Sequence, residues 1–273
     1  MYFITVSEMI GTNGEKISRK VAEQLNYYFL GEEELFKTAS EMGFLSDIKK
    51  LDEKPPALIE RFFSERPKIY LDRLQSIIYE VAKKGNTVFF GRGAQFLLQS
   101  FNCAFHVLIT GSLQKRIERI MEEKEVTREL AEKIIAQSDH DKRSFIRYAY
   151  DEDWLNCRLY DLIINTDKLS IESSVKMIIE GARSEEIKSC GIDSIRILEN
   201  LSIRRRIESE LIEAGLMKPH IFFEVEGDKE IRIYGIVDTP EEKEEIQRIL
   251  NKIKGIRKIK NEILIFTGSL GGV

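Results

Sequence analysis

A glycine-containing loop near the start of the chain has the composition of a phosphate-binding site. The apolar run 3–6 predicts a strand, a helix is predicted from about residue 15, and residues 7–14 lie between them. A strand that leads through glycines into a helix directs backbone N–H groups and the positive end of the helix dipole at one spot, which favours a phosphate. We therefore expect this loop to hold the phosphates of a nucleotide through Gly11, Thr12, Asn13 and Gly14.

The loop departs from the pattern G-x-x-x-x-G-K-[ST]. With Gly14 as the last glycine, Met9 replaces the first glycine, Glu15 the lysine and Lys16 the magnesium-binding hydroxyl residue. A carboxylate about 4 Å from a phosphate costs about 1 kcal/mol in water and about 4 kcal/mol at an effective dielectric near 20, so Glu15 should point away. Lys16 is then the nearest substitute for the missing lysine. The alternative is a helix cap that binds no ligand.

Arg92 is a second candidate phosphate ligand. It follows the apolar run 87–90, which is too short for a helix and predicts a strand buried on both faces. Open parallel sheets bind ligands at the carboxyl ends of their strands, and a guanidinium group matches a phosphate with two parallel hydrogen bonds. Taken alone, the segment 91–93 is better explained as a turn closed by a surface arginine; the other motifs along the chain reverse that preference.

Two further pairs of arginines are spaced so that they can act together. Arg116 and Arg119 are three residues apart and Arg143 and Arg147 are four apart, so each pair lies on one helical face. Cations of this kind stabilise the oxygens of a phosphoryl group in transfer and exclude water when they close over it. Nearby acidic residues offer another explanation, a solvated pair of helices joined by salt bridges; they are Glu118, Glu122, Glu123, Glu125 and Asp139.

The composition is that of a folded protein without a strong preference for polyanions. Of its 273 residues 42% are hydrophobic and its formal net charge is −4, so no global field draws it to nucleic acid or anionic lipid. With this acidic balance we expect Tyr148, Tyr150 and Trp154 to pack a lid helix against the core rather than to stack on bases. The first residues do not resemble a signal peptide and no run reaches about 18 apolar residues, which predicts a cytoplasmic protein without a transmembrane segment.

The cysteines and histidines form no metal-binding pattern. Cys103, Cys157 and Cys190 are widely separated and lack C-x-x-C spacing, which excludes a cysteine-based zinc site and is typical of buried or idle thiols in a reducing compartment. His106 lies inside an apolar strand, so we expect a core residue with its polar atoms satisfied. We expect no metal ligands in this set.

Strands alternate with helices over the first part of the chain, which predicts an α/β fold with a parallel sheet flanked by helices. A helix-rich stretch at 58–84 is expected to cover the nucleotide site. A polar linker at 184–192 separates a domain at 1–183 from a small α/β domain at 193–266. Residues 267–273 are expected to form a disordered tail.

Several segments in this order resemble the cytidylate kinase-like family of P-loop nucleoside monophosphate kinases. The resemblance covers the first domain, and family members commonly tolerate a residue other than lysine after the last loop glycine. The matching segments are 4–7 with 11–14, 88–94, 106–109 with 115–120, 141–148, 153–154 and 160–167.

This resemblance implies ATP-dependent phosphoryl transfer to a nucleoside monophosphate, with CMP as the acceptor and Mg²⁺ bridging the donor phosphates. It implies that Arg92 binds the acceptor phosphate and that Arg143 and Arg147 act on the transferring group, with Lys16 as a partial substitute for the loop lysine. Arg116 and Arg119 are further candidate phosphate ligands. The aspartate that family members often carry after paired aromatic residues is replaced here by Gly31, which leaves the identity of the acceptor open.

The second domain resembles a BON domain, a small α/β module proposed to bind phospholipid or to mediate association. The resemblance lies in the segments 235–237, 239–256 and Asn261. Two alternatives to a kinase follow. One is a nucleotide sensor that binds without turnover and contacts a protein partner or a phospholipid surface through this domain, which Glu15 and Gly31 favour. The other is a structural or oligomerising protein with a relic fold.

Overall fold

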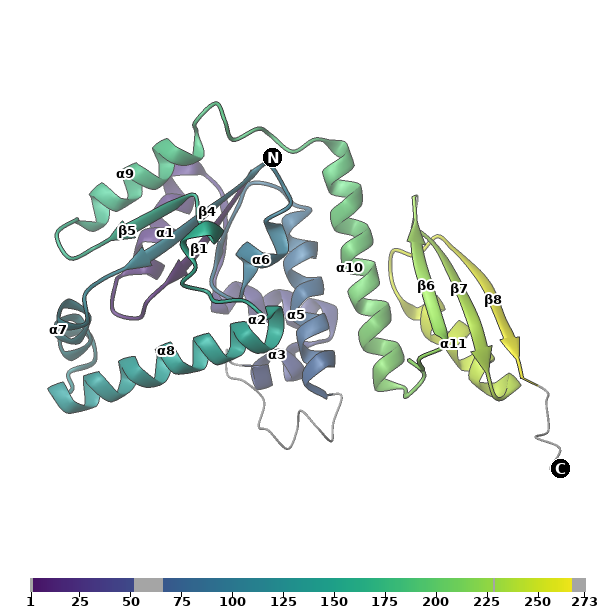
Figure 1. The fold of residues 1–273 in the computed structure, drawn as a ribbon. Helices are drawn as coiled ribbons and strands as arrows, with labels where there is room; N and C mark the ends of the chain where they lie inside the picture. The colour runs from purple at the N-terminus through teal and green to yellow at the C-terminus, as the bar shows by residue number, and fades with distance from the viewer. Residues whose placement is uncertain (1, 52–65, 228, 267–273) are drawn as a thin grey trace. The chain divides into compact units, whose positions relative to one another are not determined.

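The protein divides into two compact units (Figure 1). The structure is a computed structural model and describes residues 2–51, 66–227 and 229–266. One unit comprises Met1–Pro55 and Lys84–Gly191, and the other Pro56–Lys83 and Ile192–Val273. The predicted tail at 267–273 lies outside the described residues.

A five-stranded parallel sheet forms the centre of the first unit, which confirms the predicted fold class. The strand order is β2-β3-β1-β4-β5, so β1 is central, and five of its six residues are buried. Because all the strands are parallel, their carboxyl ends lie along the same edge of the sheet. The strands are β1 (Phe3–Glu8), β2 (Tyr28–Leu30), β3 (Thr87–Phe90), β4 (Ala104–Thr110) and β5 (Leu162–Asn165).

The helices of the first unit cover the sheet and continue from its carboxyl edge. A core cluster joins Ile4 and Val6 of β1 to Ile17 of α1 and Val175 of α9, and each such buried side chain contributes about 1.5–3 kcal/mol to stability. The helices are α1 (Gly14–Leu25), α2 (Glu32–Met42), α3 (Leu45–Leu51), α6 (Ala94–Leu98), α7 (Leu113–Lys124), α8 (Arg128–Tyr150) and α9 (Ile171–Ala182), with a 3₁₀ turn η1 (Cys157–Leu159) before β5.

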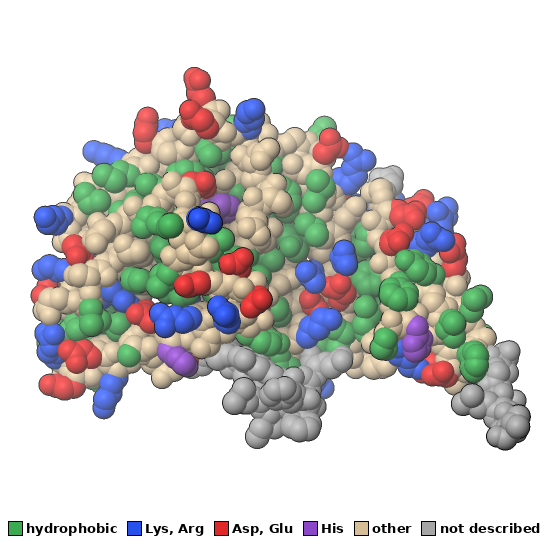
Figure 2. All heavy atoms as spheres, in the orientation of Figure 1, with side chains coloured by type: hydrophobic (Ala, Val, Ile, Leu, Met, Phe, Trp, Pro, Cys, Tyr) green, Lys and Arg blue, Asp and Glu red, His purple; other side chains and the backbone are tan. Residues whose placement is uncertain are grey.

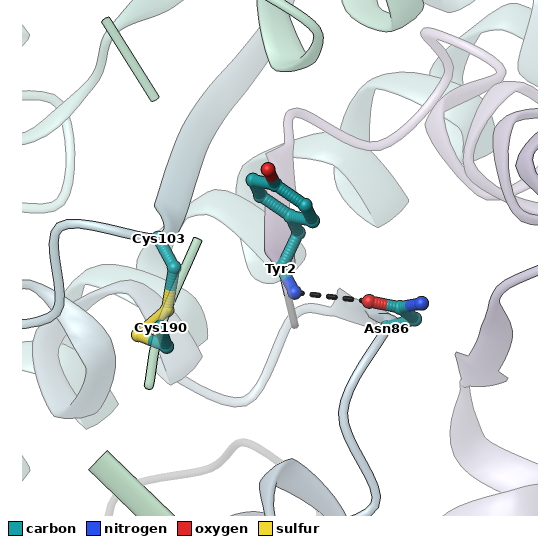
Figure 3. The surroundings of a disulfide bond; sticks show 4 residues. All are labelled: Tyr2, Asn86, Cys103 and Cys190. Carbon is teal, nitrogen blue, oxygen red and sulfur yellow. Dashed lines mark hydrogen bonds between the residues drawn. A yellow bond between two sulfur atoms is a disulfide. The ribbon is translucent and has the colours of Figure 1, made fainter. Parts of the chain in front are cut away.

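Two cysteines meet at the amino edge of this sheet. Cys103, directly before β4, forms a disulfide with Cys190, their Cα atoms 5.2 Å apart, and nearby the backbone N–H of Tyr2 donates to Asn86 Oδ1 (Figure 3). The interpretation of Cys103 and Cys190 as idle thiols is therefore wrong. Separation along the chain, 87 residues here, carries no information on distance in the fold. Cys157 is an exposed free cysteine.

The second unit combines a helix pair with a small sheet. A three-stranded sheet of order β6-β7-β8 is antiparallel at β6–β7 and parallel at β7–β8. The side chain of Thr239 accepts a hydrogen bond from Glu242 N and so caps α11. The elements are α5 (Arg66–Ala82), α10 (Ile192–Glu213), β6 (Ile221–Glu226), β7 (Glu230–Val237), α11 (Pro240–Lys252) and β8 (Lys258–Ile265).

The stretch 58–84, predicted to cover the nucleotide site, contributes α5 to this second unit, where it packs along α10. Residues 58–65 lie outside the described residues. The chain also passes from the first unit to the second between Gly191 and Ile192. Local patterns could not predict the grouping of α5 with α10, because the two helices are far apart in the sequence.

Charged side chains join α5 to α10. Arg73 pairs with Glu210 at 3.1 Å and also with Glu213, and Asp72 Oδ1 lies 3.3 Å from Arg205 Nη1. Asp72 is 3% exposed, and its second oxygen, Oδ2, has no hydrogen-bond partner. Burial raises the pKa of Asp72 to about 6, and the negative charge of Glu208 adds to this effect. The positive charges of Arg205 and Lys68 act in the opposite direction. The ionised form of Asp72 is therefore disfavoured in the folded protein.

Two surface properties bear on possible partners. Among the described residues, no helix is both long enough and apolar enough to cross a membrane. The face drawn in Figure 2 carries Lys and Arg side chains interspersed with Asp and Glu rather than a patch of one sign.

Asp72→Asn should stabilise the protein at neutral pH. A raised carboxyl pKa stabilises the fold below the ordinary pKa of 3.8, and that stabilisation is lost as the pH rises through about 6. We expect the substitution to raise the free energy of unfolding by up to about 3 kcal/mol at pH 8 and to have little effect at pH 4. Thermal unfolding at a series of pH values measures this, and an equal effect at both ends of the series would contradict it.

Candidate phosphate-binding site

The loop between β1 and α1 occupies the carboxyl edge of the sheet. Gly11 has φ +82°, and a Cβ at this position would lie 2.9 Å from the backbone oxygen of Arg116. The start of α7 therefore packs against the loop at a distance that only glycine allows. Asn13 is also left-handed, with φ 60°, and directs the chain into α1 at Gly14. The structure thus brings residues 11–14 together as one tight turn at the helix N-terminus.

A carboxylate accepts hydrogen bonds from one backbone N–H and one hydroxyl group of this turn. Glu8, the last residue of β1, accepts a hydrogen bond of 2.8 Å from Gly14 N and one of 3.2 Å from the hydroxyl of Thr12 through its Oε2 atom. Burial raises the pKa of Glu8, while the charge of Lys142 and these two bonds act in the opposite direction. The loop therefore binds an anionic group supplied by its own chain. Sequence reasoning missed Glu8, although its place at the end of a strand and directly before the loop was a usable signal.

Arg116 and Arg119 support the loop from behind. The Nε atom of buried Arg116 donates to the carbonyl of Ile10 at 2.7 Å, and its two Nη atoms make paired bonds of 2.9 and 2.7 Å to the carboxylate of Asp139. The guanidinium group of Arg119 donates to the carbonyl of Gly11 at 3.3 Å and to the hydroxyl of Thr166 at 2.9 Å. In these positions both side chains bind loop carbonyls, whereas the sequence analysis expected them to bind phosphate.

The two residues after the last loop glycine point along the helix surface. Glu15 lies 3.0 Å from Arg19 on the next turn of α1, so its carboxylate is turned away from the loop as expected. The ammonium group of Lys16 lies 3.3 Å from Glu123 and 3.4 Å from the side-chain oxygen of Asn13, and the Lys16 side chain is 58% exposed. Lys16 therefore remains beside the loop, in an ion pair at the surface.

The helix α8 reaches the loop with a lysine. Lys142 Nζ donates to the backbone oxygen of Glu8 at 2.7 Å and lies 5.1 Å from the centre of the Trp154 ring, which is buried. Arg143 and Arg147 are exposed, and Arg147 lies 3.8 Å from Asp151. The structure therefore turns toward the loop the face of α8 that carries Lys142 and Asp139. Sequence reasoning missed Lys142, because it considered the spacing of the arginines without the phase of the helix.

Arg92 lies at the same edge of the sheet, after β3. The pairing of the neighbouring strands β1 and β3 extends one residue past the end of β3, where Gly91 N donates to Val6 O at 2.9 Å. The Arg92 side chain is 15% exposed, with Nη2 3.6 Å from Glu32 Oε2. The hydroxyl of Tyr150, at the end of α8, donates to the backbone oxygen of Arg92 at 3.4 Å. One helix thus contacts both the loop and the arginine turn.

Two of the three aromatic residues expected to pack the lid helix against the core do so. The ring of half-buried Tyr150 stacks on Phe96 with centroids 4.7 Å apart, and Trp154 is buried. Tyr148 is half-buried. His106 is also a core residue as expected: its Nδ1 lies 2.7 Å from the hydroxyl of Thr5, and burial lowers its pKa, against the opposing charge of Asp161.

The residues around the loop do not include a preformed magnesium site. In the described ranges, no three His, Cys, Asp or Glu side chains lie close enough to hold a metal ion. Ser18, the nearest buried hydroxyl residue on α1, donates to the carbonyl of Gly14 at 2.7 Å and is turned into the helix. Mg²⁺ in nucleotide sites is commonly bound by substrate phosphates, water and no more than one or two carboxylates, so a cluster of three is not required.

Comparison with known proteins identifies the first unit. The model of the cytidylate kinase-like family matches residues 3–168, more than half of the chain. The chain belongs to the cytidylate kinase-like family. The loop, Arg92 and the whole of the helix α8 lie inside the matched range. A model of the BON domain matches residues 200–265, which confirms the second resemblance.

Individual relatives agree with this assignment. The cytidylate kinase of Methanocaldococcus jannaschii is 26% identical over 179 residues, which cover 64% of this chain and 94% of the relative. The cytidylate kinase of Pyrococcus horikoshii is 29% identical over 171 residues, 62% of this chain and 82% of the relative. The structure of an uncharacterised protein from Eubacterium ventriosum superposes with a TM-score of 0.55 at 19% identity, covering 68% of this chain and 100% of that protein. This last likeness concerns the fold alone.

Arg116→Met should destabilise this cytidylate kinase-like protein. The change leaves the Asp139 carboxylate without its paired partner and removes the donor to Ile10 O, so we expect a loss of about 3 kcal/mol in the free energy of unfolding. Arg128→Met is the matched control, because Arg128 pairs with Glu132 in an exposed ion pair worth less than about 1 kcal/mol. Thermal unfolding measures both. An unchanged melting temperature for Arg116→Met would show that its bonds to the loop and to Asp139 do not stabilise the fold.

Proposed function

We propose that the protein transfers a phosphoryl group from ATP to a nucleoside monophosphate, with CMP as the acceptor. One observation carries the proposal: the glycine loop follows β1 and Arg92 follows the neighbouring strand β3, so both lie at the same edge of the sheet. The chain in which they do so belongs to the cytidylate kinase-like family. These two segments can bind the phosphates of two nucleotides side by side, as transfer between them requires.

The residues have separate tasks in this proposal. Backbone N–H groups of Gly11, Thr12, Asn13 and Gly14 hold the donor phosphates, and Arg92 holds the acceptor phosphate. An oxygen of the acceptor phosphate forms a bond to the γ-phosphorus of ATP, and the bond from that phosphorus to the β–γ bridging oxygen breaks. ADP leaves with the electron pair of the broken bond, and the acceptor becomes a nucleoside diphosphate. A magnesium ion bound to the donor phosphates would supply positive charge that neutralises part of theirs.

The arginines of α8 require a conformational change to take part. Arg143 and Arg147 are exposed, so α8 has to close over the site, without rotating about its own axis, before their guanidinium groups reach a phosphoryl group. Arg116 and Arg119 act through the loop, whose carbonyl groups they bind, and Lys16 would have to leave its ion pair with Glu123.

Arg92→Ala tests the acceptor assignment in an assay of the purified protein with ATP, Mg²⁺ and each nucleoside monophosphate in turn. We expect nucleoside diphosphate to form fastest with CMP, and the variant to lose saturation by the acceptor while its affinity for ATP changes less than about threefold. A bidentate contact to phosphate contributes about 1.5–3 kcal/mol, or about 10- to 150-fold in acceptor KM.

The matched control is Arg128→Ala, which removes an exposed arginine outside the loop and the arginine turn. Loss of both acceptor and ATP binding in Arg92→Ala would contradict the assignment of Arg92. Tight ATP binding without transfer to any acceptor would contradict the kinase proposal as a whole.

A second candidate function is a nucleotide sensor that binds without turnover. The position of Glu8 favours it, since the carboxylate occupies the N–H of Gly14 that a phosphate oxygen would need. The second unit offers a contact surface for such a sensor: on one face of its sheet Phe222, Ile236 and Leu264 are 51%, 42% and 68% exposed. In this reading the BON domain contacts a protein or phospholipid partner.

Glu8→Gln should strengthen ATP binding under either function. The amide keeps an acceptor for Gly14 N and removes a negative charge that repels the phosphates, which corresponds to a five- to tenfold lower Kd at about 1 kcal/mol of repulsion. Glu23→Gln, at an exposed position on α1, removes an equal charge as a control. Binding titrations measure the change. Unchanged or weaker affinity in Glu8→Gln would show that the carboxylate does not compete with phosphate.

The proposal includes a cytoplasmic location, where ATP and nucleoside monophosphates are available as substrates. The disulfide between Cys103 and Cys190 would there meet a reducing thiol pool. Alkylation of free thiols in cell extracts, followed by mass measurement, reports directly on the state of these cysteines.

A further inference from the structure

A lysine of α8, Lys142, lies beside the loop, which itself has Glu15 in place of the usual lysine. Lys142 Nζ is 2.7 Å from the backbone oxygen of Glu8, the residue whose carboxylate accepts the hydrogen bond from Gly14 N. An ammonium group has three donors, and the bond to Glu8 O uses one of them. The charge of Lys142 is also the largest influence that opposes the rise in the pKa of the half-buried Glu8 carboxylate. Lys142 therefore already stabilises the negative charge of the Glu8 carboxylate, which the loop binds through Gly14 N.

Other cations near the loop are held elsewhere. Lys16 pairs with Glu123 at the surface, and the guanidinium groups of Arg116 and Arg119 bind carbonyl groups of the loop. A phosphate oxygen that replaced the Glu8 carboxylate on Gly14 N would find Lys142 as its neighbouring positive charge.

We propose that Lys142 of α8 is the phosphate-binding lysine of this protein and supplies, from outside the loop, the positive charge that Glu15 does not provide. This inference rests on the proposed binding of ATP at the loop. Lysine suits the task because its four-carbon stem lets a compact charge move by several ångströms while the helix stays in place.

The surroundings of Lys142 determine its position. Asp139 lies three residues earlier on the same face of α8 and is held by the paired bonds to Arg116, which fix the phase of the helix. The ring of Trp154 lies under the ammonium group, 5.1 Å away, and favours a cation there. Arg143 is the next residue along the helix, about 100° further round, so a rotation that brought it to the loop would carry Lys142 away.

The experiment compares Lys142→Met with the unaltered full chain. Titration with ATP and Mg²⁺ should give a Kd raised about 10- to 100-fold, the value of one charge-assisted contact. Circular dichroism of the variant without nucleotide, at a temperature below its unfolding, checks that it is folded. Lys142→Arg should restore most of the affinity, because it returns a cation to the same position. Lys133→Met, an exposed lysine on the same helix, is the matched control and should bind ATP normally.

Tryptophan fluorescence adds a readout that a purely structural role would not change. The chain has a single tryptophan, Trp154, and Lys142 lies over its ring. If the ammonium group moves from the ring to a phosphate, ATP should change the emission of the unaltered protein, and saturating ATP should change it less in Lys142→Met.

The outcomes separate this inference from the proposed function. If the unaltered protein binds no ATP, both are overturned. If it binds ATP and Lys142→Met binds equally well, the Lys142 assignment alone is overturned. If Arg143→Met weakens binding and Lys142→Met does not, the charge comes from the other face of α8, and the inference is wrong while the proposed function stands.

Discussion

The backbone N–H at the turn from β1 into α1 has to meet an acceptor, and in this protein the acceptor is the Glu8 carboxylate. Much of the surrounding structure follows from that contact. The Glu8 side chain is half-buried beside the loop. Gly11 lets α7 approach the loop, and Arg116 and Arg119 bind carbonyl groups of the loop. An anion and its cations are thus assembled from one chain before any ligand enters.

In the full phosphate-loop pattern the backbone N–H donors and the lysine lie within a few residues of each other. In this protein they lie on different elements. The loop retains the shape and the N–H donors, while in the proposed assignment of Lys142 the positive charge comes from a separate helix. The ion pair of Arg116 with Asp139 helps to hold that helix in its orientation. A site built in this way is sensitive to changes far from the phosphate, because any shift of α8 moves its charge. The helix also contacts the Arg92 turn through Tyr150, so both ends of the site respond to the same element.

Local patterns were enough to predict the parallel sheet, most of its strands, the loop and the outward turn of Glu15, because each depends on residues close together in the sequence. The features that the sequence did not reveal depend on the rotation of a helix about its own axis or on contacts between residues that are not adjacent in the sequence. The spacing of Arg143 and Arg147 places them on one face of α8 but does not say which face meets the loop. The partnership of Glu8 with Gly14 and the bond between Cys103 and Cys190 appear only when the chain is folded.

The grouping of α5 with α10 has a consequence for how this protein can be divided. The segment that forms α5 lies within the range matched by the cytidylate kinase-like family, whereas α10 begins after it and continues into the BON domain. A chain cut in the linker would therefore keep α5 and lose the helix that carries the partners of Arg73 and Asp72. The two domains are thus not interchangeable modules, and a gene fusion that replaced the second would also have to supply a new neighbour for α5.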